Sequence, residues 1–468
     1  MAPPAPERSG YHPLVLSWRA RPGVAIARRG DDELEVTVDG DAMAVLRPGD
    51  ATLAATLAGF ATGPGLTEDE IVGGAGADPA TVARSYYALG RFISNGLVVC
   101  RVLSDGHLLA TLIPRRRDFS IHAPPPPGLN VVLPRFAYLR RVDDALVLAC
   151  PGAACELILH GAEPAAWLAA AAQPVTLGDP HDGADEQIAL YRLAAAHGLL
   201  EVAGDPEPPA RAPWEFHDRL FHQAARSHDD LVVRGGTFRF IEEFPPPPAV
   251  RPPHPGEDIA LPAVGWTGSD SLRAVMDRRR SRREMSDHPV PLAAVGEVMY
   301  RVARTTGSAR TGPQDTIRRP YPSGGSLHEL EFYLSVGACD GLAPGCYHYR
   351  GEAHSLTRLR DATGAAEAML ATTAGAWNQP DAPPQVLVVI ASRLPRLAWK
   401  YAGIAYKVSL LNAGVVIQSL SLVTEDMGLA GCAVGSGDPG LFARATGCDP
   451  FEETSIAEFG FGLPSTAE

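Results

Sequence analysis

The segment WKYAGIAYKVSLLNAGVVIQSLSL, residues Trp399–Leu422, predicts a long buried helix near the C-terminus of the chain. From Tyr406 onward, apolar residues recur at a spacing that keeps one broad helix face apolar, namely Val408, Leu411, Val415, Ile417, Leu420 and Leu422. No proline interrupts this run, and Gly428 is a suitable stop after it. We therefore interpret the rest of the sequence around this helix.

A lysine and a tyrosine, Lys400 and Tyr401, stand side by side just ahead of that helix. The pKa of a lysine ammonium falls when the group is desolvated, and a phenol can donate or accept a proton. The pair is therefore a candidate acid–base pair, although two ordinary surface residues at a helix entry would give the same pattern. A second pair, Tyr406-Lys407, lies inside the helix and is the alternative assignment.

Length and composition indicate a globular protein of several domains. A chain of 468 residues exceeds one ordinary hydrophobic core, so two or three domains are expected. Hydrophobic residues make up 46% and charged residues 20%, as in soluble globular proteins. The net charge of −13 argues against nucleic acid as the main partner, because phosphate contacts require clustered Lys and Arg.

The cysteines and the N-terminus predict a cytoplasmic protein without a metal site. None of the seven cysteines forms a CxxC pair, and their odd number fits a reducing compartment: Cys100, Cys150, Cys155, Cys339, Cys346, Cys432 and Cys448. Arginines interrupt the first thirty residues, so no secretory signal is expected. We also expect no membrane-spanning segment, because no apolar run reaches the ~18 residues that a membrane helix needs.

The first half of the chain contains an internal repeat. DAMAVLRPGDA at Asp41–Ala51 matches DALVLACPGAA at Asp144–Ala154, and SYYALGRFISNGLVV, ending at Val99, matches ALYRLAAAHGLLEV, ending at Val202. In the second match, an amphipathic helix stops at a glycine and passes into a short strand in both copies. Two matches at nearly the same offset indicate a tandem duplication.

Each copy is expected to be a winged-helix-like module, the first over residues 1–118 and the second over 119–205. Helices are expected at Thr52–Ala61, Thr67–Val72 and Thr81–Ser94, followed by a hairpin that turns at Asp105-Gly106. Such modules bind DNA or capture peptides at a strand edge or helix groove. Peptide capture is favoured, because the candidate recognition helix carries only Arg84 and Arg91 as cations. Which copy would bind a peptide stays open.

Residues 206–260 form a proline-rich linker and are expected to wrap the following domain. Prolines cluster at Pro245–Pro248 and at Pro252–Pro255. His217 and His222 could form a metal pair, but no cysteine or carboxylate-rich partner follows from the pattern. Packing and hydrogen bonding are therefore the favoured roles of the two histidines.

The last part of the chain carries an arginine cluster and two glycine-rich turns. In SLRAVMDRRRSRR, the side chains of Arg279, Arg280, Ser281 and Arg283 could bind a phosphate, or could form a solvated basic face. The turn Pro322–Gly325 has small side chains, so its backbone N–H groups can approach a ligand closely. A second glycine-rich segment, GCAVGSGDPG, follows at Gly431–Gly440.

Four segments in order, RRRSRREMSDHPV, RRPYPSGGSLHE, WKYAGIAYKVSLLNAGVV and GLAGCAVGSGDP, resemble the nitroreductase superfamily. More narrowly, they are similar to the SagB-type dehydrogenases that make thiazoles and oxazoles in ribosomally synthesised peptides. The resemblance covers about Trp214 to the C-terminus, and the duplicated half resembles the peptide-clamp modules of longer members. It implies an α+β, FMN-binding fold over residues 261–468 and a homodimer with the flavin at the subunit interface.

The resemblance also implies roles for particular residues. The phosphate and ribityl groups of FMN would contact Arg279, Arg280 and Ser281, assisted by Arg283, and the flavin ring would lie along Pro322, Ser323, Gly324, Gly325 and Ser326. Gly435 and Ser436 match a later flavin-contacting loop, and Lys400 and Tyr401 match the catalytic pair. Two features depart from the pattern: Ala402 stands where many relatives carry glycine, and no basic phosphate-binding residue is expected beyond Gly462.

The function implied is oxidation of a peptide azoline to an azole. A ring proton would leave to Lys400 and Tyr401 acting jointly, a hydride would pass to the flavin, and dioxygen would reoxidise the flavin. A separate cyclodehydratase would make the azoline, and the clamp modules would hold the leader of the precursor peptide. Three alternatives remain: a general NAD(P)H-dependent nitro- or quinone reductase, a non-catalytic scaffold that binds the precursor, and a DNA-binding regulator.

Overall fold

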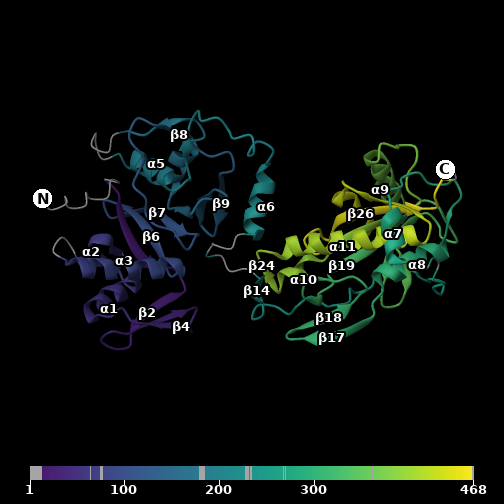
Figure 1. The fold of residues 1–468 in the computed structure, drawn as a ribbon, viewed down its shortest axis with the longest axis horizontal. Helices are drawn as coiled ribbons and strands as arrows, with labels where there is room; N and C mark the ends of the chain where they lie inside the picture. The colour runs from purple at the N-terminus through teal and green to yellow at the C-terminus, as the bar shows by residue number, and fades with distance from the viewer. Residues whose placement is uncertain are drawn as a thin grey trace. The chain divides into compact units, whose positions relative to one another are not determined.

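The computed structural model describes residues 13–63, 65–73, 77–178, 185–226, 231, 235–266, 268, 270–360 and 362–465. The chain divides into two compact units, Met1–Val232 and Val233–Glu468. Each unit has its own main sheet and its own hydrophobic core (Figure 1).

The first unit begins with a strand, a three-stranded meander, three helices and a long hairpin. The elements are β1 (Val15–Ala20), β2 (Val24–Arg28), β3 (Leu34–Val38), β4 (Asp41–Leu46), α1 (Ala51–Ala58), the 3-10 turn η1 (Gly59–Ala61), β5 (Leu66–Thr67), α2 (Glu68–Val72), α3 (Pro79–Ser94), β6 (Val98–Ser104) and β7 (His107–Pro114).

Side-chain caps fix where these helices begin. Asp50 and Asp78 each accept two backbone N–H bonds at the starts of α1 and α3, and Thr67 with Glu70 forms a capping box at α2. The three expected helices are confirmed. The expected hairpin is confirmed too, since Asp105 and Gly106 both have the positive φ, 46° and 79°, that a tight two-residue turn requires.

The second half of this unit repeats the order of elements. It contains β8 (Asn130–Val132), β9 (Tyr138–Val142), β10 (Ala145–Ala149), β11 (Cys155–Leu159), α4 (Ala162–Ala170), β12 (Val175–Thr176), α5 (Glu186–Ala196) and β13 (Glu201–Val202). The pairing repeats as well: β1 pairs with β5 and β6, and β8 pairs with β12 and β13, all antiparallel. The repeated topology supports a duplication.

One of the two sequence matches is out of register with this topology. The match around Gly96 and Gly198 joins equivalent segments, because α3 leads to β6 and α5 leads to β13. The match of Asp41–Ala51 with Asp144–Ala154 instead aligns β4 with β10, whereas β4 is the third strand of its meander and therefore corresponds to β11. The Pro-Gly pairs differ in role, since Gly49 precedes α1 and Gly152 joins β10 to β11.

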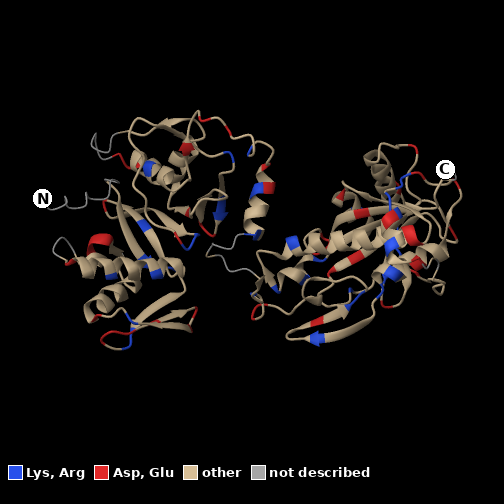
Figure 2. Ribbon diagram, in the orientation of Figure 1, with Lys and Arg blue, Asp and Glu red and all other residues tan. Residues whose placement is uncertain are grey.

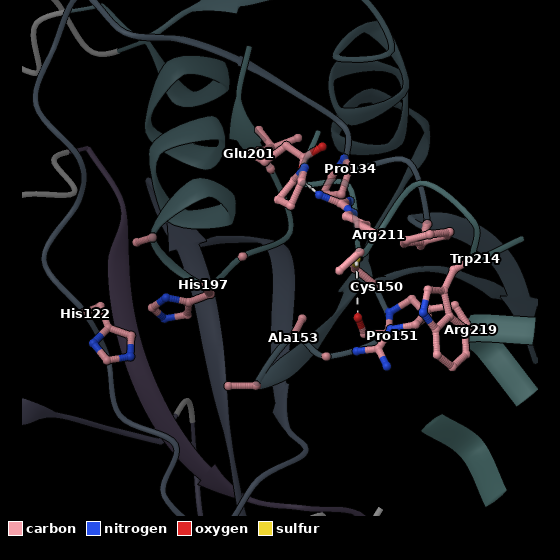
Figure 3. Close-up of a pocket in the computed structure, with 18 residues that line it drawn as sticks. His122, Pro134, Cys150, Pro151, Ala153, His197, Glu201, Arg211, Trp214 and Arg219 are labelled. Atoms are coloured by element: carbon pink, nitrogen blue, oxygen red, sulfur yellow. Dashed lines mark hydrogen bonds and ion pairs between the residues drawn. The ribbon is translucent and has the colours of Figure 1, made fainter. Parts of the chain in front are cut away.

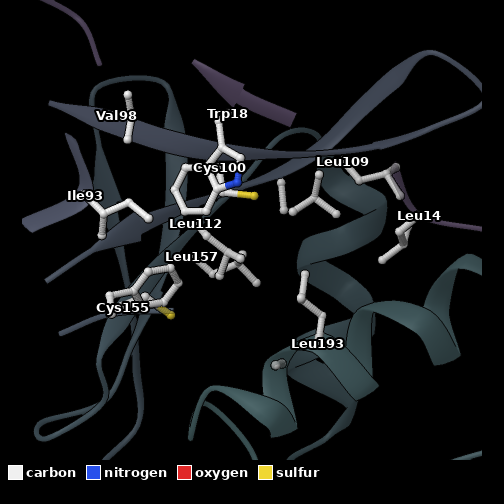
Figure 4. Packing of buried hydrophobic residues seen from close by; sticks show 14 of the residues in the cluster. Leu14, Trp18, Ile93, Val98, Cys100, Leu109, Leu112, Cys155, Leu157 and Leu193 are labelled. Atoms are coloured by element: carbon white, nitrogen blue, oxygen red, sulfur yellow. The ribbon is translucent and has the colours of Figure 1, made fainter. Parts of the chain in front are cut away.

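The two copies share one sheet and one core. The sheet has the order β5-β1-β6-β7-β11-β10-β9, so β7 of the first copy pairs with β11 of the second. Trp18, Cys100 and Leu112 from the first copy pack in the same buried cluster as Leu157 and Leu193 from the second (Figure 4). The winged-helix class and the boundaries 1–118, 119–205 and 206–260 stay predictions.

The second unit is built around a seven-stranded sheet in the order β15-β22-β21-β19-β23-β26-β25, with every neighbouring pair antiparallel. Its strands are β14 (Gly235–Gly236), β15 (Asp258–Ala260), β16 (Val290–Pro291), β17 (Gly307–Thr311), β18 (Gln314–Arg318), β19 (Leu330–Val336), β20 (Cys339–Asp340), β21 (Gly345–Arg350), β22 (Ser355–Arg358), β23 (Val386–Ser392), β24 (Tyr401–Ala402), β25 (Ala430–Val434) and β26 (Thr454–Gly462). Its helices are α7 (Leu272–Arg278), α8 (Leu292–Ala303), the 3-10 turn η2 (Gly324–Ser326), α9 (Thr363–Ala376), α10 (Leu394–Ala398), α11 (Ala405–Asp426) and α12 (Pro439–Thr446).

Helices cover both faces of this sheet. On one face, Val298 of α8 and Val416 of α11 pack in a cluster with Val388 of β23. On the other face, Met369 of α9 and Phe442 of α12 pack in a second cluster. This three-layer arrangement confirms the α+β class expected for the C-terminal half.

Part of the proline segment is hydrogen-bonded to the core of the second unit. Two buried guanidinium groups hold its carbonyls, with Arg393 Nη2 2.9 Å from the oxygen of Pro248 and Arg396 Nη1 2.9 Å from that of Pro247. The indole N–H of Trp399 donates to the carbonyl of Phe244 at 2.8 Å. These bonds fix residues 244–248 beside the start of α11.

The helix expected from the sequence is α11, but its predicted buried face is only partly confirmed, since Leu420 is buried and Ile417 packs against the core. Its buried side is formed by Ser409, Asn412, Ala413, Val416, Leu420, Thr424 and Glu425. Leu411 and Val415 are instead 60% and 36% exposed, and Tyr406 and Leu410 are also exposed. Small and polar residues face the sheet because they meet polar groups there, such as Ser392 Oγ, 2.7 Å from Ser409 Oγ.

By length and composition alone, α11 is apolar enough to cross a membrane, the one such helix in the described parts of the chain. This differs from the expectation that no apolar run is long enough. Its buried side chains and its contacts with α8, β25 and β26 are those of a core helix. A cytoplasmic location stays a prediction.

Candidate active site

The glycine corner, residues Pro322–Ser326, lies between β18 and β19 and packs on the first half of α11. Gly325 and Ser326 have φ angles of 63° and 58°, so the backbone turns through the left-handed region, which glycine adopts at little cost. A Cβ atom added to Gly324 would lie 2.4 Å from Cγ1 of Val408, which leaves no room for a side chain there. The sequence places glycine where α11 approaches the backbone most closely.

Lys400 and Tyr401 converge on this corner. They follow the short helix α10 and precede α11, and both side chains are half-buried. A Cβ atom added to Gly325 would lie 2.4 Å from Tyr401 Oη and 2.9 Å from Lys400 Nζ. The structure therefore brings together an ammonium, a phenol and an exposed glycine turn, three of the features that the sequence singled out.

An aromatic segment that the sequence did not assign to the site lines the other side of the pair. β14 pairs with β24, and the N–H of Phe238 donates to the carbonyl of Lys400 at 3.1 Å. The Nζ of Lys400 lies 5.7 Å from the ring centroid of Phe238 and 5.2 Å from that of Tyr401. Both distances are within the range of a cation–π contact, which stabilises the position of the ammonium.

Asn412 is a second residue missing from the predicted site. Its side-chain oxygen accepts from the N–H of Gly324 at 3.2 Å, and its Nδ2 donates to Ser323 Oγ at 3.1 Å and to the Glu329 carboxylate. The Asn412 side chain therefore connects the glycine corner to α11 by hydrogen bonds. The sequence does contain one indication of this role. Asn412 is an amide in the middle of a mainly apolar helix, and a buried polar group there needs hydrogen-bond partners.

The arginine cluster lies beside the far end of α11. The side chains of Arg278 and Arg282 are anchored on the buried carboxylate of Glu425, with nitrogen–oxygen distances of 3.1 and 3.9 Å. Within the described residues, Arg279, Arg280 and Arg283 have no ion pair or side-chain hydrogen bond, and Ser281 is exposed. Three such guanidinium groups within five residues of the chain favour an anionic ligand such as a phosphate.

One chain does not bring the two halves of the predicted site together. Asn412 holds the glycine corner and Glu425 holds the arginine segment, and their separation of thirteen positions corresponds to about 20 Å of helix. The corner with Lys400 and Tyr401 therefore lies near one end of α11 and the arginine cluster near the other. Tyr406 and Lys407, the alternative pair, belong to the first turn of α11.

Gly435 and Ser436 are exposed and follow β25, next to a buried carboxyl group. A Cβ atom added to Gly437 would lie 2.7 Å from Oε1 of Glu458, a residue of β26 that is 3% exposed. Burial, and to a smaller extent the charge of the nearby Asp438, raises the pKa of Glu458 to about 7. A carboxyl group with such a pKa can exchange a proton near neutral pH.

The first unit contains a separate cavity of about 710 Å³ in its second copy. Its lining includes Arg211, Arg219, Trp214 and His197 (Figure 3). His197 is 4% exposed and neither ring nitrogen has a hydrogen-bond partner among the described residues, and burial lowers its pKa to about 4. None of the residues predicted to form the active site lines this cavity.

The two histidines of α6 (Phe216–Arg226) have different surroundings. The ring of His222 packs edge-on against Trp214, with centroids 5.4 Å apart. His217 is exposed and lies 3.5 Å from Glu215 and 3.6 Å from Asp218. The possible ligand atoms of these three residues lie within 4.8 Å of one another, but exposed acidic groups of this kind are common without an ion.

Comparison with known proteins identifies two regions. Residues 276–462 match the model of the nitroreductase family, and residues 131–230 match the model described as cyanobactin oxidase ThcOx. The first match covers the main sheet of the second unit except β15, together with both halves of the candidate site. The second match covers the second copy in the first unit and continues through α6.

Two relatives and one solved structure illustrate these similarities. A predicted nitroreductase of Methanocaldococcus jannaschii is 26% identical over 165 residues, which are 35% of this chain and 78% of the relative. The trifolitoxin-processing protein TfxB of Rhizobium leguminosarum bv. trifolii is 24% identical over 162 residues, 34% of this chain and 43% of that protein. In the Escherichia coli microcin synthetase McbBCD complex with truncated pro-MccB17, one chain is 17% identical, with a TM-score of 0.34, 56% of this chain covered and 95% of that chain.

Proposed function

We propose that the chain, whose residues 276–462 match the nitroreductase family, is an FMN-dependent dehydrogenase that oxidises peptide thiazolines or oxazolines to thiazoles or oxazoles. The observation that carries this proposal is the convergence of Lys400 and Tyr401 on Gly325. An acid–base pair beside an exposed glycine turn is suited to removing a proton from a ring that lies along that turn.

The residues present fit FMN at both of its ends. The exposed turn at Gly324 and Gly325, which carries no side chains and leaves no room for a Cβ atom, suits the close approach of a ring to the backbone. Arg279, Arg280 and Arg283, with Ser281 between them, suit its phosphate and ribityl groups. When bound, FMN would supply the two-electron oxidation that removal of a ring hydrogen requires.

Lys400 and Tyr401 would abstract or relay the ring proton jointly. Lys400 would accept the proton as the neutral amine, and its Nζ lies 5.7 Å from the centroid of the Phe238 ring and 5.2 Å from that of the Tyr401 ring, which hold it in place. Asn412 and the buried Glu329 would keep the corner rigid, so that the substrate ring meets the pair in one geometry.

A homodimer would complete the site. The corner and the arginine cluster lie about 20 Å apart along α11, so one flavin would take its ring contacts and its phosphate contacts from different protomers. The exposed apolar side chains of α11, Tyr406, Leu410, Leu411 and Val415, offer the apolar surface that such an interface requires.

The first unit supports a peptide substrate. Its residues 131–230 match the cyanobactin oxidase model, and one relative of the chain is named for processing of trifolitoxin. We propose that this unit holds the leader of a ribosomally made precursor and raises the local concentration of its azoline rings at the flavin. The azolines would come from a separate cyclodehydratase.

Mass spectrometry of an azoline-bearing peptide incubated with the flavin-loaded protein tests this function. We expect each ring to lose two hydrogens with the wild-type chain, and to remain unchanged with Lys400→Ala or Tyr401→Phe. Flavin absorbance of each variant separates lost chemistry from lost cofactor. Full turnover by Lys400→Ala with flavin bound would remove this residue from the mechanism.

A general nitro- or quinone reductase is the second candidate, because the archaeal relative is named as a nitroreductase. Such an enzyme would oxidise NADPH in the presence of a nitroaromatic compound and would not need the first unit. Rapid NADPH turnover together with unchanged azolines would favour this alternative.

A further inference from the structure

The strand β4 is an unprotected edge of the small sheet β2-β3-β4. Among the described residues, β4 pairs with β3 alone. Asp41–Val45 are all exposed, and the side chains of Met43 and Val45 are 61% and 45% exposed. A row of unpaired backbone groups with apolar side chains is a surface on which another strand can add.

The equivalent strand of the second copy already has such a partner. β11, the third strand of its meander, pairs antiparallel with β7, from Cys155 opposite Pro114 to Leu159 opposite Ala110. The partner strand is apolar, and a basic residue follows it at once: Arg115 Nη2 lies 2.7 Å from Oε1 of Glu156 on β11. The chain itself therefore shows what this kind of edge binds, an extended apolar segment that ends in a cation.

β4 lacks the protection that another edge strand of this unit carries. β9 ends the seven-stranded sheet, and its exposed Arg140 and Arg141 place two charges within five residues. Charged side chains of this kind oppose the addition of a further strand. From Ala42 to Leu46, β4 has no charged residue (Figure 2).

The charges around β4 favour a basic partner. Residues 31–50 contain seven carboxylates, of which four are paired with Arg28, Arg29, Arg47 or Arg84, so that Asp32, Asp39 and Asp41 are left without an ion pair among the described residues. The seven are Asp31, Asp32, Glu33, Glu35, Asp39, Asp41 and Asp50. In β11, Glu156 stands near the start of the strand and contacts Arg115, which follows the last paired residue of β7. Asp41 stands at the start of β4. An antiparallel strand added to β4 would therefore place a cation after its last paired residue close to Asp41.

We propose that β4 of the first copy, and not the second copy, is the peptide-binding edge of the first unit. Its ligand is an extended segment that pairs antiparallel with Asp41–Leu46, carries apolar side chains, and has Arg or Lys directly after its last paired residue. The identification of this segment as part of the precursor rests on the proposed function, whereas the binding itself does not.

The test uses the full-length chain and a peptide of known sequence, HLLATLIPRRR, which copies residues 107–117. With a fluorescent label on this peptide, we expect saturable binding in the micromolar range. Amide hydrogen exchange should slow at residues 41–46 when the peptide is present, and should not change at β9.

Two variants examine charge and edge separately. Asp41→Arg should weaken binding by about tenfold or more, because an attraction at the end of the strand becomes a repulsion. Asp144→Arg, at an exposed aspartate in the turn between β9 and β10, is the matched control and should bind as the wild type does. The double variant Met43→Lys/Val45→Lys should abolish binding, since it gives β4 the charged edge that β9 has.

Absence of saturable binding, or slowed exchange at β9 or at residues 150–154 of the cavity in place of β4, would overturn the proposal. Equal losses of peptide affinity in Asp41→Arg and Asp144→Arg would overturn the proposal as well. Flavin content and ring oxidation are measured on the same samples. A chain without flavin or oxidation that still protects β4 would contradict the proposed function and leave the peptide edge standing.

Discussion

The side-chain amide of Asn412 donates to both carboxylate oxygens of Glu329, at 3.1 and 3.0 Å. Glu329 is fully buried and Asn412 is 6% exposed, so the bonds lie away from water. The same asparagine also accepts from the N–H of Gly324 and donates to the hydroxyl of Ser323. The Asn412–Glu329 pair therefore fixes the position of the glycine corner.

The pair predicts the outcome of Asn412→Asp. This change keeps the size of the side chain but places a second carboxylate beside the buried Glu329, which should destabilise the second unit by about 3 kcal/mol at pH 8. We expect a lower thermal midpoint and loss of flavin on dilution, both partly restored at pH 5, where one carboxyl can be protonated. Asn412→Ala, which removes the bonds without adding charge, is the control. An Asp variant no less stable than the Ala variant would contradict the argument.

The close approach of Gly325 to the acid–base pair predicts a second outcome. In Gly325→Ala, the new methyl group would lie 2.4 Å from Tyr401 Oη and 2.9 Å from Lys400 Nζ, so the pair must move. We expect ring oxidation to fall by at least about tenfold, because a shift of the proton acceptor disturbs the reacting geometry.

Gly312→Ala is the matched control for this substitution. Gly312 lies in the turn between β17 and β18 and has nearly the same φ, 62° against 63°, but no atom lies within 4 Å of an added Cβ. Both variants carry the backbone strain of alanine at positive φ, about 1 kcal/mol, and only Gly325→Ala has the clash. Equal turnover in the two variants would show that contact with Lys400 and Tyr401 is unimportant.

The separation along α11 predicts complementation between protomers. Arg279→Ala/Arg280→Ala should lose flavin, and Lys400→Ala should keep flavin but lose oxidation. If each site combines the corner of one protomer with the arginines of its partner, a mixed dimer contains one intact site. Co-expression of the two variants should then restore about a quarter of the wild-type activity, since half of the dimers are mixed and half of their sites are intact. Size-exclusion chromatography and flavin content accompany the assay, and a mixture without activity would place the site within one chain.

The local features of the site could be predicted from the sequence because they depend on neighbouring residues. The tight turn of Gly324-Gly325, the positive φ of Asp105-Gly106 and the helix after Tyr401 follow from backbone preferences of a few residues. The α+β class was implied by the resemblance to the nitroreductase superfamily and is confirmed.

The remaining features depend on contacts between distant residues. The buried side of α11 could not be predicted, because apolar spacing alone does not tell which apolar face meets the sheet and which is left for another surface. Asn412 and Glu329 are 83 residues apart, and nothing local to either residue identifies the other. The pairing of β7 with β11 likewise joins two copies that sequence similarity alone treats as separate modules.

The raised pKa of Glu458 predicts a pH-dependent stability of the second unit. Burial, and then the charge of Asp438, raises this pKa from 4.5 to about 7 in the folded chain. Between these values the folded state binds more protons than the unfolded state, so stability falls as pH rises, and the loss is complete above about pH 7. The shift corresponds to a loss of up to about 3 kcal/mol in the free energy of unfolding.

Glu458→Gln has no proton to lose, so it should exceed the wild type in free energy of unfolding at pH 8 and match it near pH 4.5. Asp438→Asn keeps an oxygen to cap α12 and removes one cause of the shift, so it should move the transition to lower pH. Denaturant titrations at several pH values measure all three chains, and parallel pH profiles for the wild type and Glu458→Gln would show that this carboxyl does not titrate near neutrality.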